Sequence, residues 1–137
     1  MAPTAGYSGT PLAKKLGIGE GDRVALIGEP DHFRDLLAPI PDGVEFRTSV
    51  RGHNEVVVAF FVSRSDFTRR LGALGRSVFP ADGLWIAWPK KASKVPTDMT
   101  EDVVREVALP TGLVDVKVCA IDETWSGLRL VWRKELR

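Results

Sequence analysis

Three short apolar runs, each of β-strand length and apolar on both faces, constrain the fold of this 137-residue chain more than any other feature. They span residues 23–28, 55–62 and 84–88. A strand with apolar side chains on both faces must be covered on both sides, which is the arrangement of parallel sheets. The middle run is rich in valine and phenylalanine, which favours a central strand. The runs therefore predict a parallel sheet at the centre of the fold.

Two long helical patterns follow the second and third runs, as parallel strands joined by crossover helices require. Ser63 or Ser65 can cap the first of these helices, and the second is predicted to start at Asp98 or Thr100. Residues of each helix that share one face are apolar and are expected to be buried. These stripes consist of Phe67, Leu71 and Leu74 in the first helix, and of Val103, Val104, Val107 and Ala108 in the second.

Shorter elements complete the predicted fold. Helices are expected over residues 11–16 and 31–38, and a brief strand over residues 44–46. Strands over residues 114–121 and 128–133 have no helix between them, so they are predicted to form an antiparallel hairpin. The predicted fold class is therefore α/β, a three-layer Rossmann-like domain whose mainly parallel sheet ends in a C-terminal antiparallel hairpin.

The chain divides into a predicted flexible N-terminal arm, residues 1–9, and a single Rossmann-like domain, residues 10–137. The one cysteine, Cys119, provides no disulfide framework, and its apolar surroundings in the sequence predict a buried side chain. The first residues lack the basic start and apolar core of a signal peptide, and no apolar run is long enough to span a membrane. A cytoplasmic location is therefore expected.

The charge balance excludes partners that are attracted by a global field. The chain has 19 basic and 18 acidic residues and a net charge of +1, which draws in neither nucleic acid nor an anionic membrane. Arginines surround the helix after Ser63, but Asp66 lies among them and no aromatic residues alternate with them, so no nucleic-acid partner is expected. His32 and His53 are the only histidines, and no metal site is expected. The oligomeric state stays open.

Ligands of open α/β sheets collect beyond the carboxyl ends of the strands. This rule selects residues 47–54, 63–65, 89–95 and 122–126, together with the first turn, residues 28–32, which begins with Gly28, Glu29 and Pro30. A turn that holds phosphate needs several glycines and free N–H groups, whereas this turn has one glycine and a proline without an N–H. Dinucleotide binding is therefore not expected, and Gly28 can serve simply to make a tight turn. Gly28 and Glu29 are still candidate ligand-binding residues because of their place at this edge.

A lysine-rich loop follows the run at residues 84–88. Its three ammonium groups and one hydroxyl lie just past Trp88 and can bind a phosphate or a carboxylate. A solvated surface loop has the same composition, because charge clusters of this size are common on protein surfaces. Trp85 and Trp88 point to opposite faces of their strand, so at least one is expected in the core. The candidate ligand-binding residues are Lys90, Lys91, Ser93 and Lys94.

The predicted hairpin connection, residues 122–127, is the third candidate segment. Asp122, Glu123 and Trp125 could form one wall of a ligand site. Alternatively, Asp122 accepts hydrogen bonds from nearby backbone, and Trp125 folds onto the sheet edge. Carboxylates on adjacent strand residues point apart, so Asp122 and Glu123 make a poor acid and base pair.

Residues 7–18, 88–94 and 122–128 resemble an uncharacterised bacterial family of short proteins, a domain of unknown function. The resemblance covers nearly the whole chain from about residue 6 and implies no activity, because that family has none assigned.

Residues 16–28, residues 79–85 and the closing hairpin are similar to a shortened class I methyltransferase. The resemblance implies a methyltransferase-like fold and S-adenosylmethionine as cofactor, held by the turn at Gly28 and by Glu29. Such enzymes usually carry an acidic-Gly-x-Gly-x-Gly turn, of which Gly28 matches here. They also carry an acidic residue at the end of the second strand and an extra helix, strand and helix, for which the span 46–55 is too short.

The sequence supports three hypotheses of function. The leading one is a non-catalytic binding module that takes a small anionic ligand or a protein partner at the carboxyl edge of the sheet. The alternative is a small S-adenosylmethionine-dependent, methyltransferase-like enzyme. The third is an obligate partner-binding protein that uses residues 128–133 as the outer edge strand, with Trp132 as an exposed anchor. No catalytic residue is assigned, and the identity of the ligand stays open.

Overall fold

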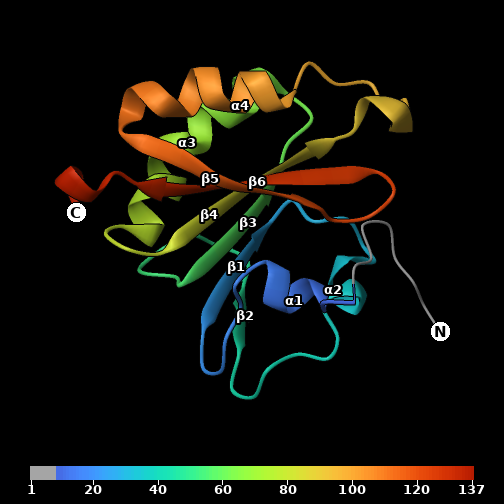
Figure 1. The fold of residues 1–137 in the computed structure, drawn as a ribbon, viewed down its shortest axis with the longest axis vertical. Helices are drawn as coiled ribbons and strands as arrows, with labels where there is room; N and C mark the ends of the chain where they lie inside the picture. Colours follow the sequence, from blue (N-terminus) through green and yellow to red (C-terminus); the bar gives the residue numbers. More distant parts are fainter. Residues whose placement is uncertain (1–8) are drawn as a thin grey trace.

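The computed structural model describes residues 9–137 and contains one six-stranded sheet with helices on both faces (Figure 1). The predicted arm lies outside these residues except for Gly9. The strand order is β2-β1-β3-β4-β6-β5. The strands are β1 (Arg23–Ile27), β2 (Glu45–Arg47), β3 (Val56–Phe60), β4 (Gly83–Pro89), β5 (Leu113–Ala120) and β6 (Trp125–Trp132). The α-helices are α1 (Leu12–Lys15), α2 (Phe33–Leu36), α3 (Arg64–Val78) and α4 (Glu101–Ala108).

The sheet combines a parallel and an antiparallel part, as predicted. Strands β2, β1, β3 and β4 are parallel neighbours, whereas β6 runs antiparallel to both β4 and β5. The sheet is therefore mainly parallel with a C-terminal antiparallel hairpin, which confirms the predicted fold class. Short 3-10 helices cover Lys91–Ser93, Leu109–Thr111 and Lys134–Leu136.

Alternate side chains of the central strands feed two cores on opposite faces of the sheet. Val57 packs in the core under α3 and α4, whereas Val58 packs in the core under α1 and α2. Figure 1 shows these two helix pairs on opposite sides of the sheet. Trp85 and Trp88 divide in the same way and are both buried, as the three-residue spacing requires.

The helix caps follow the sequence signals. Ser63 caps α3 by accepting a hydrogen bond from the Asp66 N–H, and Thr100 caps α4 by accepting one from the Val103 N–H. These are the side-chain oxygens that satisfy the free N–H groups of a first helical turn. The stripe of α3 is buried as predicted, and α4 buries Val104 and Ala108 fully. Cys119 is buried, and this burial raises the pKa of its thiol.

The structure corrects the boundaries of two predicted elements. The helix predicted over residues 31–38 is a single turn, α2. Strand β6 begins at Trp125, three residues before the predicted start, because Trp125 and the next residues pair directly with Pro89 and Ala120. The hairpin connection is correspondingly short.

The third hypothesis placed the outer edge of the sheet wrongly. Strand β6 lies between β4 and β5, so β5 is the edge strand. Trp132 is half-buried and donates a hydrogen bond from Nε1 to the carbonyl oxygen of Gly75, 2.9 Å away. It anchors β6 to α3 rather than standing exposed. Among residues 9–137, no helix has the length and apolar composition needed to cross a membrane.

Candidate functional site

The turn after β1 brings the backbone close to the neighbouring strand. Gly28 has a φ of +69°, and a Cβ at this position would lie 3.1 Å from the carbonyl oxygen of Phe60. Both the positive φ and the close approach therefore require glycine. The following residue, Glu29, is half-buried, and its Oε2 lies 3.7 Å from Nε of Arg34. The carboxylate of Glu29 is thus partly neutralised within its own turn.

A histidine–aspartate pair links this first turn to the β5–β6 hairpin. Nε2 of His32 lies 2.7 Å from Oδ2 of Asp122. The other carboxylate oxygen, Oδ1, accepts hydrogen bonds from the N–H groups of Thr124 and Trp125 at 2.8 and 2.7 Å. Burial alone would raise the pKa of Asp122, but these hydrogen bonds outweigh it, so the pKa is lowered. Nδ1 of His32 makes no hydrogen bond within residues 9–137, and the side chain is exposed.

Aromatic side chains close to both ends of this link pack against one another. The ring of Phe60, at the end of β3, lies edge-on between Phe33 and Trp125, with ring centroids 4.9 and 5.1 Å apart. Edge-to-face pairs at these distances are favourable beyond the area that they bury. Trp125 is therefore packed onto the sheet edge, and Asp122 bonds the adjacent backbone, which is the simpler of the two interpretations of this segment. Glu123 is exposed and makes no ion pair among residues 9–137.

The lysine loop is joined to the same hairpin. The N–H of Lys90 donates to the carbonyl oxygen of Thr124 at 2.7 Å. The hydroxyl of Ser93 donates to the carbonyl oxygen of Lys90 and accepts from the Val95 N–H, so it serves the turn. Lys94 has a left-handed backbone, with a φ of +62°. No carboxylate of the described chain pairs with the ammonium groups of this loop.

A cavity of about 460 Å³ lies beside the lysine loop on the α4 face of the sheet. Trp88, Pro89 and Met99 form its apolar wall, and Lys91 lies at its rim. Its two threonines are already engaged, Thr97 with the Val62 carbonyl oxygen and Thr100 as the α4 cap. The cavity therefore offers apolar surface and one free cation, which is the complement of a small organic anion.

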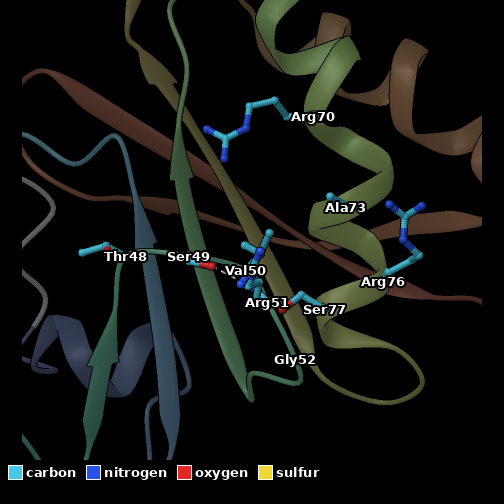
Figure 2. Close-up of a pocket in the computed structure, with 9 residues that line it drawn as sticks. All are labelled: Thr48, Ser49, Val50, Arg51, Gly52, Arg70, Ala73, Arg76 and Ser77. Carbon is cyan, nitrogen blue, oxygen red and sulfur yellow. Dashed lines mark hydrogen bonds between the residues drawn. The ribbon is translucent and has the colours of Figure 1, made fainter.

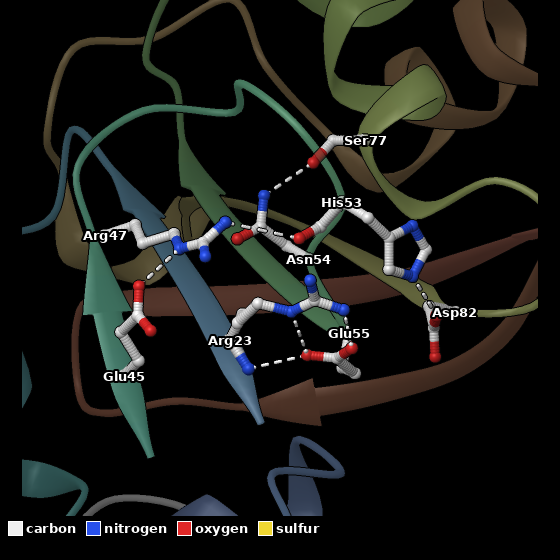
Figure 3. Close-up of polar contacts among 8 residues, drawn as sticks. All are labelled: Arg23, Glu45, Arg47, His53, Asn54, Glu55, Ser77 and Asp82. Carbon is white, nitrogen blue, oxygen red and sulfur yellow. Dashed lines mark hydrogen bonds and ion pairs between the residues drawn. The ribbon is translucent and has the colours of Figure 1, made fainter. Parts of the chain in front are cut away.

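The opposite, amino edge of the sheet holds a second polar network (Figure 3). Arg23 makes a fork-shaped ion pair with Glu55, and His53 lies 2.6 Å from Asp82. Arg47 is the last residue of β2, at the carboxyl end of that strand, and its side chain reaches back to bond Glu45 and the carbonyl oxygen of His53. The end of the second strand thus carries a guanidinium that is already engaged. No group of three potential metal ligands occurs within residues 9–137.

The structure thus brings most of the predicted edge residues into one connected region. Glu29 and Gly28 lie in the turn that His32 ties to Asp122, and Lys90 is tied to the same hairpin through Thr124. Glu123, Lys91 and Lys94 extend from it into solvent. The sequence analysis placed His32 in the first candidate segment but weighed no role for it beyond a metal ligand, and it did not predict that Phe33 and Phe60 pack beside this link. The available signals were the phenylalanine at the end of β3 and the polar residues of the turn after β1.

Comparison with known proteins finds no matching family model and no matching curated protein. Solved structures do match along most of the chain. A methyltransferase from Aquifex aeolicus that depends on S-adenosylmethionine aligns with a TM-score of 0.61 and 17% identity, covering 87% of this chain and 86% of that chain. A putative type 11 methyltransferase from Sulfolobus solfataricus aligns at 0.60 and 13%, covering 90% of each.

N-methyltransferase NodS from Bradyrhizobium japonicum, in complex with S-adenosyl-L-homocysteine, aligns with a TM-score of 0.59 and 14% identity. The match covers 90% of this chain and 84% of that chain. At these identities the matches show a shared fold. The methyltransferase-like fold that residues 16–28 and 79–85 implied is therefore confirmed, whereas the resemblance to the uncharacterised bacterial family rests on its three segments alone.

Proposed function

We propose that this chain binds S-adenosylmethionine and its product S-adenosylhomocysteine at the carboxyl edge of the sheet and acts as a small methyltransferase. One observation carries the proposal: nearly the whole chain superimposes on methyltransferases, one of which holds S-adenosylhomocysteine. This favours the enzymatic hypothesis over the non-catalytic binding module. A cytoplasmic location is part of the same proposal.

The residues at the edge fit such a ligand on one side. Gly28 is exposed, so the backbone of this turn is open to a ligand at the carboxyl edge of the sheet. Glu29 lies next in this turn and would face the positively charged end of the ligand. When bound, S-adenosylmethionine supplies an electrophilic methyl group. His32 is the edge residue that would accept a proton from a methyl acceptor, through Nδ1.

The fit is absent on the ribose side. A ribose is usually held by a carboxylate at the end of the second strand. Here that position is Arg47, whose guanidinium bonds Glu45 and the His53 carbonyl oxygen. We therefore derive no contact with the ribose, and we expect binding to be weaker than in an enzyme with an acidic residue at this position.

Calorimetry with S-adenosylhomocysteine and S-adenosylmethionine tests the proposal directly. We expect binding by the unaltered chain, and a loss of about tenfold in affinity for Gly28→Ala, because the added Cβ moves the turn. The matched control is Gly21→Ala. Gly21 has a φ of +75° with nothing near its Cβ position, and it lies at the amino end of β1. Both substitutions carry the backbone cost of a positive φ, but only Gly28 lies at the edge. Absence of binding at millimolar ligand would end the proposal.

The second candidate function, binding of a small anionic ligand without catalysis, has its own supporting observation. The three ammonium groups of the lysine loop have no acidic partner among residues 9–137, and one of them, that of Lys91, lines the apolar cavity at Trp88. A thermal-shift screen of small carboxylates and phosphorylated metabolites would detect such a ligand, since preferential binding to the folded state raises the melting temperature. Replacing Lys90, Lys91 and Lys94 together by alanine should remove the shift. If the shift persists in that variant, the ligand binds elsewhere.

A further inference from the structure

A second concavity lies between the loop after β2 and helix α3 (Figure 2). Its volume is about 440 Å³, and it shares no lining residue with the cavity at Trp88. The loop contributes residues 48–52, and α3 contributes Arg70, Ala73, Arg76 and Ser77. None of the nine lining residues is acidic, so the charge of the lining is +3 from its three arginines.

The three arginines of this pocket differ from most others in the chain. Six arginines elsewhere form ion pairs with carboxylates: Arg23, Arg34, Arg47, Arg64, Arg69 and Arg105. Within residues 9–137, no carboxylate pairs with Arg51, Arg70 or Arg76, and all three are exposed. The guanidinium groups without a carboxylate partner among residues 9–137 thus include all three that line this pocket.

The spacing on α3 makes the hollow. Arg70, Ala73 and Ser77 recur at helical spacing, so they share one face of α3, whereas Arg76 lies about a third of a turn away from Arg70 around the helix. The small side chain of Ala73 leaves room on this face beside Arg70. Figure 2 shows Arg70 reaching from α3 toward the strands, whereas the guanidinium of Arg76 lies on the other side of the helix. Arg70 and Arg51 are therefore the principal cations, and Arg76 lies at the rim.

A buried hydroxyl completes the set of donors. Ser77 is 2% exposed, and its Oγ accepts a hydrogen bond from Nδ2 of Asn54 at 2.7 Å. No acceptor among residues 9–137 takes the hydroxyl proton, so Ser77 keeps a donor at the pocket floor. The hydroxyls of Thr48 and Ser49 lie on the loop side. Guanidinium and hydroxyl groups line the pocket and no carboxylate does, so the pocket is suited to an anion with several oxygens.

We propose that this pocket binds a small organic phosphate. Phosphate offers several acceptor oxygens to the guanidiniums of Arg51 and Arg70 and to the hydroxyl of Ser77. A nucleic-acid strand fits the pocket less well, because no aromatic side chain lines it for base stacking and the adjacent arginines, Arg64 and Arg69, are already paired. The site is independent of the proposed adenosyl site.

Titration calorimetry with inorganic pyrophosphate and with ribose 5-phosphate, at low ionic strength, tests the site. Both compounds should bind, and ribose should not. Arg51→Gln and Arg70→Gln should each weaken binding about tenfold, because each removes a charge-assisted hydrogen bond. Ala73→Leu should abolish binding by filling the hollow, and an exposed helix position tolerates leucine well. Arg76→Gln should have a smaller effect than Arg70→Gln.

Arg69→Gln is the matched control, because it makes the same charge change on the adjacent residue of α3, outside the pocket. It should leave the affinity unchanged. Absence of phosphate binding, or binding that survives Ala73→Leu, would overturn the proposal. Loss of binding in the triple lysine variant alone would place the phosphate at the lysine loop and would overturn it too. Binding of S-adenosylhomocysteine should be unaffected by Ala73→Leu, so the two proposals fail separately.

Discussion

The carboxylate of Glu55 shows how strongly one residue can depend on its partner. It accepts hydrogen bonds from the backbone N–H, Nε and Nη2 of Arg23 at 2.6, 3.1 and 2.5 Å (Figure 3). These side-chain hydrogen bonds, opposed by burial, lower the pKa of Glu55 from 4.5 to about 2. Because the pKa is lower in the folded state, the pair stabilises the fold above pH 4.5. This contribution is lost as the pH falls toward 2.

Glu55→Gln should therefore lower the free energy of unfolding at pH 7 by about 1–2 kcal/mol, a figure reduced for the partial exposure of the pair. It should also flatten the loss of stability between pH 4.5 and pH 2. Urea denaturation at a series of pH values measures both effects. Glu123→Gln, at an exposed position, serves as the control and should keep the pH dependence of the unaltered chain. An unchanged slope in Glu55→Gln would show that other carboxylates govern this pH range.

At the same scale, the sequence could predict the position of Asp122 in a turn but not its partner. Hydrogen bonds to the next N–H groups are local and follow from residue type and spacing. The contact with His32 joins residues 90 positions apart, and only the strand order brings them together. For the same reason, the sequence did not show that Arg51, Arg70 and Arg76 line one pocket.

Among the elements, the hairpin between β5 and β6 is held to the first turn by Asp122. Asp122→Ala removes the acceptor for two backbone N–H groups and for His32, and should cost about 1–3 kcal/mol. His32→Ala removes only the exposed end of the link and should cost less than about 1 kcal/mol. A double-mutant cycle measured by urea denaturation isolates the coupling between the two side chains, which should be about 0.5 kcal/mol or more. Strict additivity would show that the contact does not stabilise the fold.

The cap of α3 provides a second test among the elements. The sequence allowed either Ser63 or Ser65, and the structure selects Ser63, whose Oγ accepts from the Asp66 N–H at 3.2 Å. Ser63→Ala should lower the free energy of unfolding by about 1 kcal/mol. Ser65→Ala, inside the first turn, should change it by less than about 0.5 kcal/mol. Equal losses would show that the hydrogen bond from the Asp66 N–H to Ser63 does not set the stability of this helix start.

Helix starts were predictable because caps are local, whereas the start of β6 was not. The prediction ended the hairpin connection at Gly127, since glycine is common in turns. In the structure Gly127 lies within β6, and a Cβ there would lie 3.2 Å from the Trp85 ring and 3.3 Å from Ile121. The glycine is needed for close packing across the sheet, which depends on tertiary contacts. Sequence position alone does not distinguish these two uses of glycine.

At the scale of the whole molecule, the class of fold followed from the order of the elements. Strands apolar on both faces, separated by helices, allow few arrangements, because parallel crossovers are right-handed and short. The order β2-β1-β3-β4-β6-β5 adds one fact that the sequence did not supply: the last strand inserts beside β4. This insertion leaves β5 at the edge, with Val116 and Val118 about half exposed, at 51% and 49%.

The two cores share every central strand, and this predicts that the molecule unfolds as one unit. Leu74 lies in the core under α3 and α4, and Leu26 lies in the core under α1 and α2. Leu74→Ala and Leu26→Ala should each lower the free energy of unfolding by about 2–5 kcal/mol. In neither variant should the two cores unfold separately, because the loss of one core exposes strands on which the other core also depends.

Tryptophan fluorescence and far-ultraviolet circular dichroism, recorded on the same urea series, measure this cooperativity. The four tryptophans divide between the two cores, Trp88 and Trp132 in one and Trp85 and Trp125 in the other, so their fluorescence reports on both cores, while circular dichroism reports on the whole backbone. The two transitions should coincide in both variants. Val118→Ala, at an exposed edge position, should change the free energy of unfolding by less than about 0.5 kcal/mol. Two separate transitions in Leu26→Ala would show that the layer with α1 and α2 unfolds on its own. His32 and Gly28 lie on the side of that layer. The proposed ligand edge would then be ordered independently of α3 and its arginines.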